Sequence, residues 1–151
     1  SLLSLLTGNE EGKNKRRDWV FAEYHGDRVN TGTFMLRQGK WKYIKNIGYK
    51  PRLFNLEKDP WEVDNLAGER AEIVGKLDEL LESIVDCKEI DKRAKKYDRE
   101  NFKKWRQEQK KAGTYKEKMA EIYSGFNNLC IEDIRPWTDE DENKIKNWLE
   151  L

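Results

Sequence analysis

Two apolar runs meet at a glycine in Phe34-Met35-Leu36-Arg37-Gln38-Gly39-Lys40-Trp41-Lys42-Tyr43-Ile44. The runs 34–37 and 40–44 are rich in apolar and aromatic residues, which favour β-strands. Gln38-Gly39 suits a tight two-residue turn between them. The stretch therefore predicts an antiparallel hairpin.

Further strands are predicted on both sides of this hairpin. The segment from Trp19 to His25 is rich in aromatic and β-branched residues, and Leu53-Phe54-Asn55-Leu56 forms a fourth short run. Asp59-Pro60 closes that run, because proline cannot donate a ladder hydrogen bond and favours a turn. The sequence thus predicts a sheet of about four strands.

After Pro60 the apolar period changes from two to 3.6, which is typical of helices. One predicted helix carries an apolar face made of Ile73, Val74, Leu77, Leu80, Leu81, Ile84 and Val85. Three further helices are predicted: one from about Asp98 to Lys111, one that starts after Thr114 and one that starts after Thr138. Strands followed by helices indicate an α+β fold, a small antiparallel sheet followed by amphipathic helices.

The composition limits the classes of function. The 151 residues are 36% hydrophobic and 39% charged, with a formal net charge of +1. The overall charge therefore gives no case for nucleic acid or an anionic membrane as partner, although a local cluster of charge could still bind one. No apolar run approaches the ~20 residues that span a bilayer, and the first six residues are too short for a signal peptide. Cys87 and Cys130 have no CxxC spacing, so a zinc or redox site is not predicted. Two idle thiols and a disulfide both stay open.

A catalytic site needs a nucleophile with a base, a metal cluster or convergent carboxylates. The chain has one histidine, His25, at the end of a predicted strand, and no Gly-rich phosphate loop. Loops at strand ends often carry sites, and imidazole can donate to an anionic substrate. From the residues alone, a structural role for His25 is the favoured interpretation. An independent enzyme is not predicted.

The densest group of cations lies in residues 37–52, which contain no acidic residue. The cations are Arg37, Lys40, Lys42, Lys45, Lys50 and Arg52, with Trp41, Tyr43 and Tyr49 between them. Because aromatic faces stack on rings and cations neutralise anions, the segment could hold a sulfated sugar or a nucleic acid backbone. A strand pair with its aromatic residues in the core and its lysines in water explains the same pattern.

Several segments, taken in order, resemble the closing part of the sulfatase family. They are Ser1-Leu2-Leu3-Ser4-Leu5-Leu6-Thr7-Gly8, Val20-Phe21-Ala22-Glu23-Tyr24-His25-Gly26, the hairpin 34–44, Leu53-Phe54-Asn55-Leu56-Glu57-Lys58-Asp59-Pro60 and Asp64-Asn65-Leu66-Ala67. The later Tyr97-Asp98-Arg99-Glu100-Asn101-Phe102-Lys103-Lys104-Trp105-Arg106-Gln107 and Trp148-Leu149 resemble the branch of the family that removes 2-sulfate groups from uronates of glycosaminoglycans.

The resemblance implies an alkaline-phosphatase-like fold, in which a large α/β domain precedes a smaller domain of four antiparallel strands and packed helices. Residues 1–18 would be the end of the large domain and a linker. Residues 19–91 would be the antiparallel sheet with a packed helix, and 92–151 a helical C-terminal tail.

Family members make a formylglycine nucleophile from Cys or Ser in a Cys/Ser-x-Pro-x-Arg motif and hold calcium with Asp and Asn residues. The prolines of this chain are Pro51, Pro60 and Pro136, and none has Cys or Ser two positions before it. The resemblance therefore implies that formylglycine and calcium belong to an upstream part of a parent protein. This chain alone is expected to be inactive, with no catalytic residue and no metal ligand.

In relatives the loop after the Glu-Tyr-His strand lies near the mouth of the active site. The resemblance thus implies substrate contacts from His25, Asn30 and Thr31. The expected partners are the N-terminal catalytic domain of the parent and a sulfated carbohydrate. Parent sulfatases are often periplasmic, secreted or lysosomal.

Two other classes of function stay open. The first is a non-catalytic polyanion-binding module that uses the basic hairpin 37–52. The second is a helical interaction or homo-oligomerisation piece that uses residues 98–151. If the chain is part of a larger protein, we expect an exposed apolar patch on the first strand and on Leu2, Leu3, Leu5 and Leu6.

Overall fold

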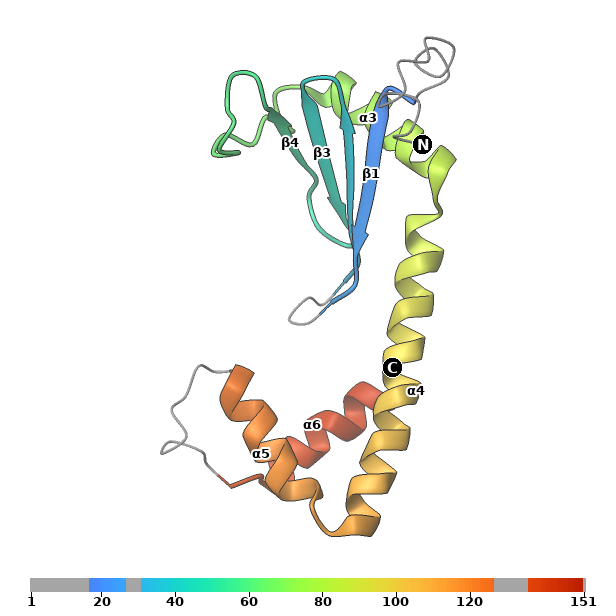
Figure 1. Cartoon of the computed structure of the whole chain (residues 1–151), viewed down its shortest axis with the longest axis vertical. Helices are drawn as coiled ribbons and strands as arrows, with labels where there is room; N and C mark the ends of the chain where they lie inside the picture. Colours follow the sequence, from blue (N-terminus) through green and yellow to red (C-terminus); the bar gives the residue numbers. More distant parts are fainter. Residues whose placement is uncertain (1–16, 27–30, 127–135, 151) are drawn as a thin grey trace, which may run out of the picture. The chain divides into compact units, whose positions relative to one another are not determined.

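The computed structural model describes residues 17–26, 31–126 and 136–150. The chain divides into two compact units, Ser1–Asp91 and Lys92–Leu151. None of the described helices is long and apolar enough to cross a lipid bilayer. The first unit contains the sheet and the second contains helices (Figure 1).

The first unit is built on one antiparallel sheet with the strand order β1-β2-β3-β4. The strands are β1 (Trp19–Tyr24), β2 (Thr33–Gln38), β3 (Trp41–Asn46) and β4 (Arg52–Asn55). Each strand pairs with the next in the chain, so the sheet is a simple meander. The predicted α+β fold with about four strands is confirmed.

The turn of the central hairpin differs from the prediction by one residue. Gln38 pairs with Trp41, so the two turn residues are Gly39 and Lys40 instead of Gln38-Gly39. Gly39 has a φ of +55°, a left-handed conformation that glycine adopts without steric cost. The glycine therefore takes the first turn position and Gln38 stays in the ladder.

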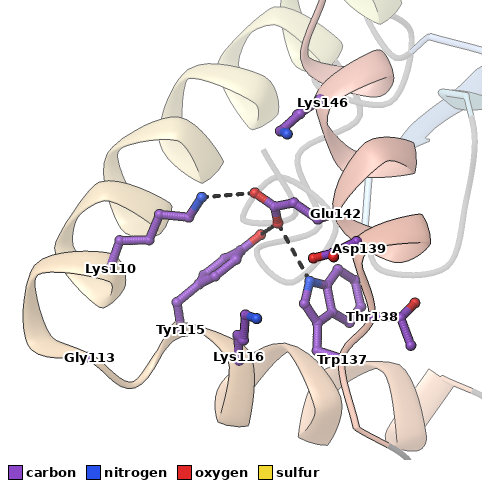
Figure 2. Close-up of a pocket in the computed structure, with 9 residues that line it drawn as sticks. All are labelled: Lys110, Gly113, Tyr115, Lys116, Trp137, Thr138, Asp139, Glu142 and Lys146. Carbon is purple, nitrogen blue, oxygen red and sulfur yellow. Dashed lines mark hydrogen bonds and ion pairs between the residues drawn. The ribbon is translucent and has the colours of Figure 1, made fainter.

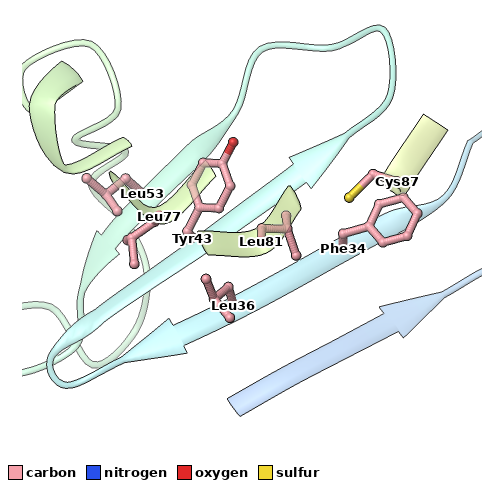
Figure 3. Packing of buried hydrophobic residues seen from close by; sticks show 7 residues of the cluster. All are labelled: Phe34, Leu36, Tyr43, Leu53, Leu77, Leu81 and Cys87. Atoms are coloured by element: carbon pink, nitrogen blue, oxygen red, sulfur yellow. The ribbon is translucent and has the colours of Figure 1, made fainter. Parts of the chain in front are cut away.

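The core of the first unit lies between one face of the sheet and a helix. Helix α3 (Ala71–Ile84) buries Leu77 and Leu81, and the predicted apolar face is confirmed because its other members pack around this core. The buried cluster consists of Phe34, Leu36, Tyr43, Leu53, Leu77, Leu81 and Cys87, whose side chains converge in Figure 3.

Helix α4 (Cys87–Ala112) begins well before the predicted start at Asp98. The Asp86 carboxylate accepts a hydrogen bond from the Glu89 backbone N–H at 2.9 Å, which is the contact of an N-terminal cap. The pattern Asp86-x-x-Glu89 thus marks the helix start, and the prediction overlooked it.

The second unit contains the rest of α4 with α5 (Tyr115–Phe126) and α6 (Asp139–Glu150). Its core is largely aromatic. Tyr115, Met119 and Trp137 are buried, and Phe102, Trp105 and Ile145 pack against them. The ring centroids of Trp105 and Tyr115 lie 6.1 Å apart in an edge-to-face arrangement. This is one of the arrangements that aromatic pairs prefer.

The first strand exposes apolar side chains, as predicted. Val20 is 60% exposed and Tyr24 is 52% exposed, while Trp19 and Phe21 pack against the core. Alternate residues of a strand point to opposite faces, so Val20, Ala22 and Tyr24 form one outward row. The predicted exposure of the four leucines at the start of the chain concerns residues outside the described ranges.

Candidate functional site

The loop between β1 and β2 carries the residues predicted to contact substrate. His25 and Gly26 follow β1, and Thr31 and Gly32 lead into β2. The pairing of Tyr24 with Thr33 closes the sheet at the base of this loop. Residues 27–30, including Asn30, lie outside the described ranges. The structure therefore brings His25 and Thr31 to one end of the sheet.

The His25 imidazole has a defined packing position. Its ring meets the Phe34 ring edge-on, with centroids 5.4 Å apart and planes at 76°. A Cβ added to Gly32 would lie 2.6 Å from His25 Cε1, which is closer than two carbon atoms can approach. Glycine at position 32 thus leaves the space that the imidazole occupies, and Phe34 fixes the orientation of the ring.

The His25 Nε2 atom is buried and has no hydrogen-bond partner among the described residues. The Glu23 carboxylate is 3.9 Å away, which is too far for a hydrogen bond. Most buried polar atoms in folded proteins are paired, and an unpaired one calls for a ligand, a water or another partner. His25 Nε2 is therefore available to bond with a group outside the described residues.

Asp91 of α4 fixes the other end of the loop. One carboxylate oxygen accepts hydrogen bonds from the Thr31 hydroxyl at 2.9 Å and from the Gly32 N–H at 2.6 Å. Asp91 is 5% exposed and Thr31 is 8% exposed, and bonds to a buried carboxylate are strong. The Thr31 hydroxyl thus holds the loop. The substrate contacts predicted for Asn30 and Thr31 stay predictions.

The importance of Asp91 was missed because it stands in the charged run Lys88-Glu89-Ile90-Asp91-Lys92. Such a residue is usually solvated. Asp91 is four positions after the buried Cys87, so both lie on one face of the helix. A prediction that started the helix at Cys87 instead of Asp98 would have placed Asp91 on the buried face.

The basic hairpin 37–52 does not present its cations as one free surface. Lys42 Nζ lies 2.6 Å from a Glu62 oxygen, and Lys45 Nζ lies 2.7 Å from Asp78 and 2.6 Å from Glu82. Lys42 and Lys45 are separated by an odd number of positions along β3 and thus point to opposite faces of the sheet.

The aromatic residues of this hairpin are mostly part of the core. Tyr43 is 2% exposed, and its hydroxyl donates a hydrogen bond to Asp78 at 2.7 Å. Burial and this bond raise the pKa of the Tyr43 phenol. Trp41 packs at the edge of the same core. The hairpin geometry therefore favours the structural interpretation over the polyanion-binding alternative.

Cys87 is a buried, free thiol. Burial raises its pKa to about 11, so the nucleophilic thiolate is disfavoured. Cys130 lies outside the described ranges. Among the described residues, no three His, Cys, Asp or Glu side chains gather to hold a metal ion. These residues do not by themselves fit the calcium ion that the resemblance implies.

Comparison with known proteins finds relatives among the sulfatases. A scan against protein-family models finds no match. The chain is 39% identical to human arylsulfatase K over 146 residues, 91% of this chain and 25% of the relative. It is 42% identical to arylsulfatase K of Danio rerio over 92 residues, 59% of this chain and 18% of the relative. The chain thus spans about a fifth to a quarter of the length of these relatives.

A solved structure supports the fold assignment. The chain is similar to a protein described as a 2-O GAG sulfatase, with a TM-score of 0.52 and 28% identity. The match covers 62% of this chain and 21% of that protein. The matched proteins are again several times longer than the aligned region.

Proposed function

Because the chain has the sequence and fold of the carboxy-terminal region of sulfatases, we propose that it works as part of a sulfuric ester hydrolase. A separate catalytic domain would supply the formylglycine nucleophile and the calcium ion. The chain spans only 25% of the length of human arylsulfatase K. This supports the proposal that a larger part of the protein carries the catalytic residues. The similarity over 91% of the chain is the observation that carries this proposal.

The proposed substrate is a sulfated carbohydrate, with a 2-sulfated uronate of a glycosaminoglycan as the specific choice. The solved relative is described as a 2-O GAG sulfatase, which supports this choice. The sequence resemblance of residues 97–107 to the uronate 2-sulfatase branch agrees with this choice.

The outward row on β1 is the proposed contact with the catalytic domain. Val20 and Tyr24 are more than half exposed, on a strand at the edge of the sheet. Exposed apolar side chains on an edge strand invite pairing or packing with another segment. Covering this row would bury apolar surface and place the β1–β2 loop beside the partner domain.

The proposed role of His25 is to donate a hydrogen bond from Nε2 to the bound substrate. The atom is buried without a partner among the described residues, and Phe34 and Gly32 fix the ring. A donor held in place before binding loses little entropy when it meets an anionic group. His25 is thus a substrate-binding residue in this proposal, and the nucleophile lies in the catalytic domain.

Replacing His25 by alanine in a protein that joins this chain to its catalytic domain is expected to lower kcat/KM about 10- to 100-fold for a 2-sulfated uronate disaccharide. A lost hydrogen bond to a charged group costs about 1.5–3 kcal/mol. His25→Gln, which keeps an N–H donor, should retain more activity. Steady-state hydrolysis of the disaccharide measures both variants.

The matched control is Lys50→Ala, an exposed residue of the β3–β4 connection, which should leave kcat/KM unchanged. Hydrolysis of 4-nitrocatechol sulfate separates sugar contacts from sulfate contacts. A loss on the disaccharide alone assigns His25 to the sugar, and an equal loss on both substrates assigns it to the sulfate. Unchanged hydrolysis of both substrates by His25→Ala would rule out the proposed contact.

A further inference from the structure

The second unit contains a cavity of about 430 Å³ beside the first turns of α5 and α6. Pockets of roughly 300–1,000 Å³ hold small ligands, so this volume suits one or two sugar rings. Its walls include the rings of Tyr115 and Trp137 and the side chains of Lys116, Glu142 and Lys146 (Figure 2).

The aromatic walls of the cavity are held in place by one carboxylate. The Tyr115 hydroxyl donates to Glu142 Oε2 at 2.9 Å, and Trp137 Nε1 lies 3.5 Å from the same oxygen. Tyr115 is 5% exposed and Trp137 is 9% exposed. Lys110 Nζ also lies 4.9 Å from the Tyr115 ring centroid. The two rings are thus fixed before a ligand binds, and only a small part of each is left for it to contact.

The Glu142 charge is already neutralised within the protein. Its Oε1 accepts hydrogen bonds from the Arg106 guanidinium and from Lys110 Nζ, the latter at 2.8 Å. Burial alone would raise the pKa of Glu142, but the bonds from Lys110, Arg106 and Tyr115 lower it to about 2. A ligand in the cavity therefore meets a carboxylate that is paired with cations.

Two further cations line the cavity without such a partner. Lys116 and Lys146 are exposed and form no ion pair with any residue in the part of the chain that the structure describes. Figure 2 shows both side chains among the residues that line the cavity. Asp139 is the other acidic residue of the lining. With Glu142 paired, the surplus charge in the cavity is positive.

We propose that this cavity binds an acidic sugar, with Lys116 and Lys146 contacting its sulfate or carboxylate groups and Tyr115 and Trp137 contacting its ring. Aromatic rings favour the apolar face of a sugar, and lysines favour its anionic groups. The site would hold a saccharide chain at a place other than the His25 loop, in the second unit. The choice of a sulfated saccharide rests on the proposed function. The expectation that the cavity prefers an anionic ligand rests only on the charges of its lining residues.

The test uses the 151-residue chain labelled with ¹⁵N and three probes: a 2-sulfated uronate disaccharide, the same disaccharide without sulfate, and inorganic sulfate. We expect the sulfated disaccharide to shift the Trp137 indole N–H resonance in a saturable manner. We also expect the desulfated disaccharide and inorganic sulfate to bind at least about 10-fold more weakly, because each keeps only part of the contacts.

The double variant Lys116→Gln/Lys146→Gln should weaken binding of the sulfated disaccharide at least about 10-fold, since it removes both unpaired cations. The matched control is Lys118→Gln/Lys144→Gln, which removes the same charge from exposed positions of the same two helices outside the cavity.

Three outcomes would overturn the proposal. They are no shift of Trp137 with the sulfated disaccharide, equal binding of inorganic sulfate and the disaccharide, and equal losses in the two double variants. Because the readout is binding to this chain, its failure leaves hydrolysis by the longer protein untouched. Failure of hydrolysis together with intact binding would instead reject the proposed function.

Discussion

Replacing Asp91 by alanine is expected to lower the free energy of unfolding of the first unit by about 3 kcal/mol. The buried carboxylate accepts bonds from the Thr31 hydroxyl and the Gly32 N–H, and its loss leaves both donors buried without this acceptor. Bonds to charged groups contribute about 1.5–3 kcal/mol each, and shared acceptors do not add fully. Amide hydrogen exchange should show Gly32 opening roughly 100-fold more often.

Asp91→Asn keeps one acceptor oxygen and should give a smaller loss than Asp91→Ala. Asp98→Ala is the control, because Asp98 is an exposed residue of the same helix and should change exchange at Gly32 little. Equal exchange at Gly32 in the wild type and in Asp91→Ala would show that the carboxylate does not hold the loop.

Replacing Glu142 by glutamine is expected to destabilise the second unit by about 3 kcal/mol at pH 7. The Glu142 carboxyl has a pKa of about 2 against an ordinary value of 4.5. A pKa difference of one between the folded and unfolded states changes the free energy of unfolding by about 1.36 kcal/mol. Because the folded pKa is the lower one, the stabilisation is complete above pH 4.5 and is lost as the pH falls from 4.5 through about 2. Glutamine imitates the protonated carboxyl, so the two proteins should converge at low pH.

Hydrogen exchange in α5 and α6 at pH values from 7 to 2, corrected for the intrinsic rates, measures this difference. The control is Glu140→Gln, since Glu140 is 78% exposed and pairs with Lys144 on the surface of the same helix. That change should have little effect at any pH. A difference in stability between wild type and Glu142→Gln that stays constant from pH 7 to pH 2 would contradict the stabilising role of the bonds from Arg106, Lys110 and Tyr115 to the Glu142 carboxylate.

The sheet and α3 could be predicted from the sequence because their signals are local. The runs around Gly39 alternate or end at turn residues, and the seven apolar residues on α3 repeat with the helical period. The turn was misplaced by one residue because Gln38-Gly39 and Gly39-Lys40 both contain the required glycine. Only the pairing of Gln38 with Trp41 distinguishes them.

The contacts that build the candidate sites could not be predicted, because they join distant residues. Asp91 meets Thr31 across 60 positions of sequence, and Arg106 meets Glu142 across 36. Each of these charges resembles a solvated surface residue when read along the chain. His25 was selected from its place after a strand, whereas the space left by Gly32 appears only in the fold.

The most direct test of the central claim is hydrolysis of a 2-sulfated uronate disaccharide by two proteins. One is this chain alone, and the other joins it to the upstream catalytic domain that the proposal requires. We predict no hydrolysis by the chain alone and turnover by the longer protein. Hydrolysis by the chain alone would contradict the account. So would a longer protein that hydrolyses neither the disaccharide nor 4-nitrocatechol sulfate.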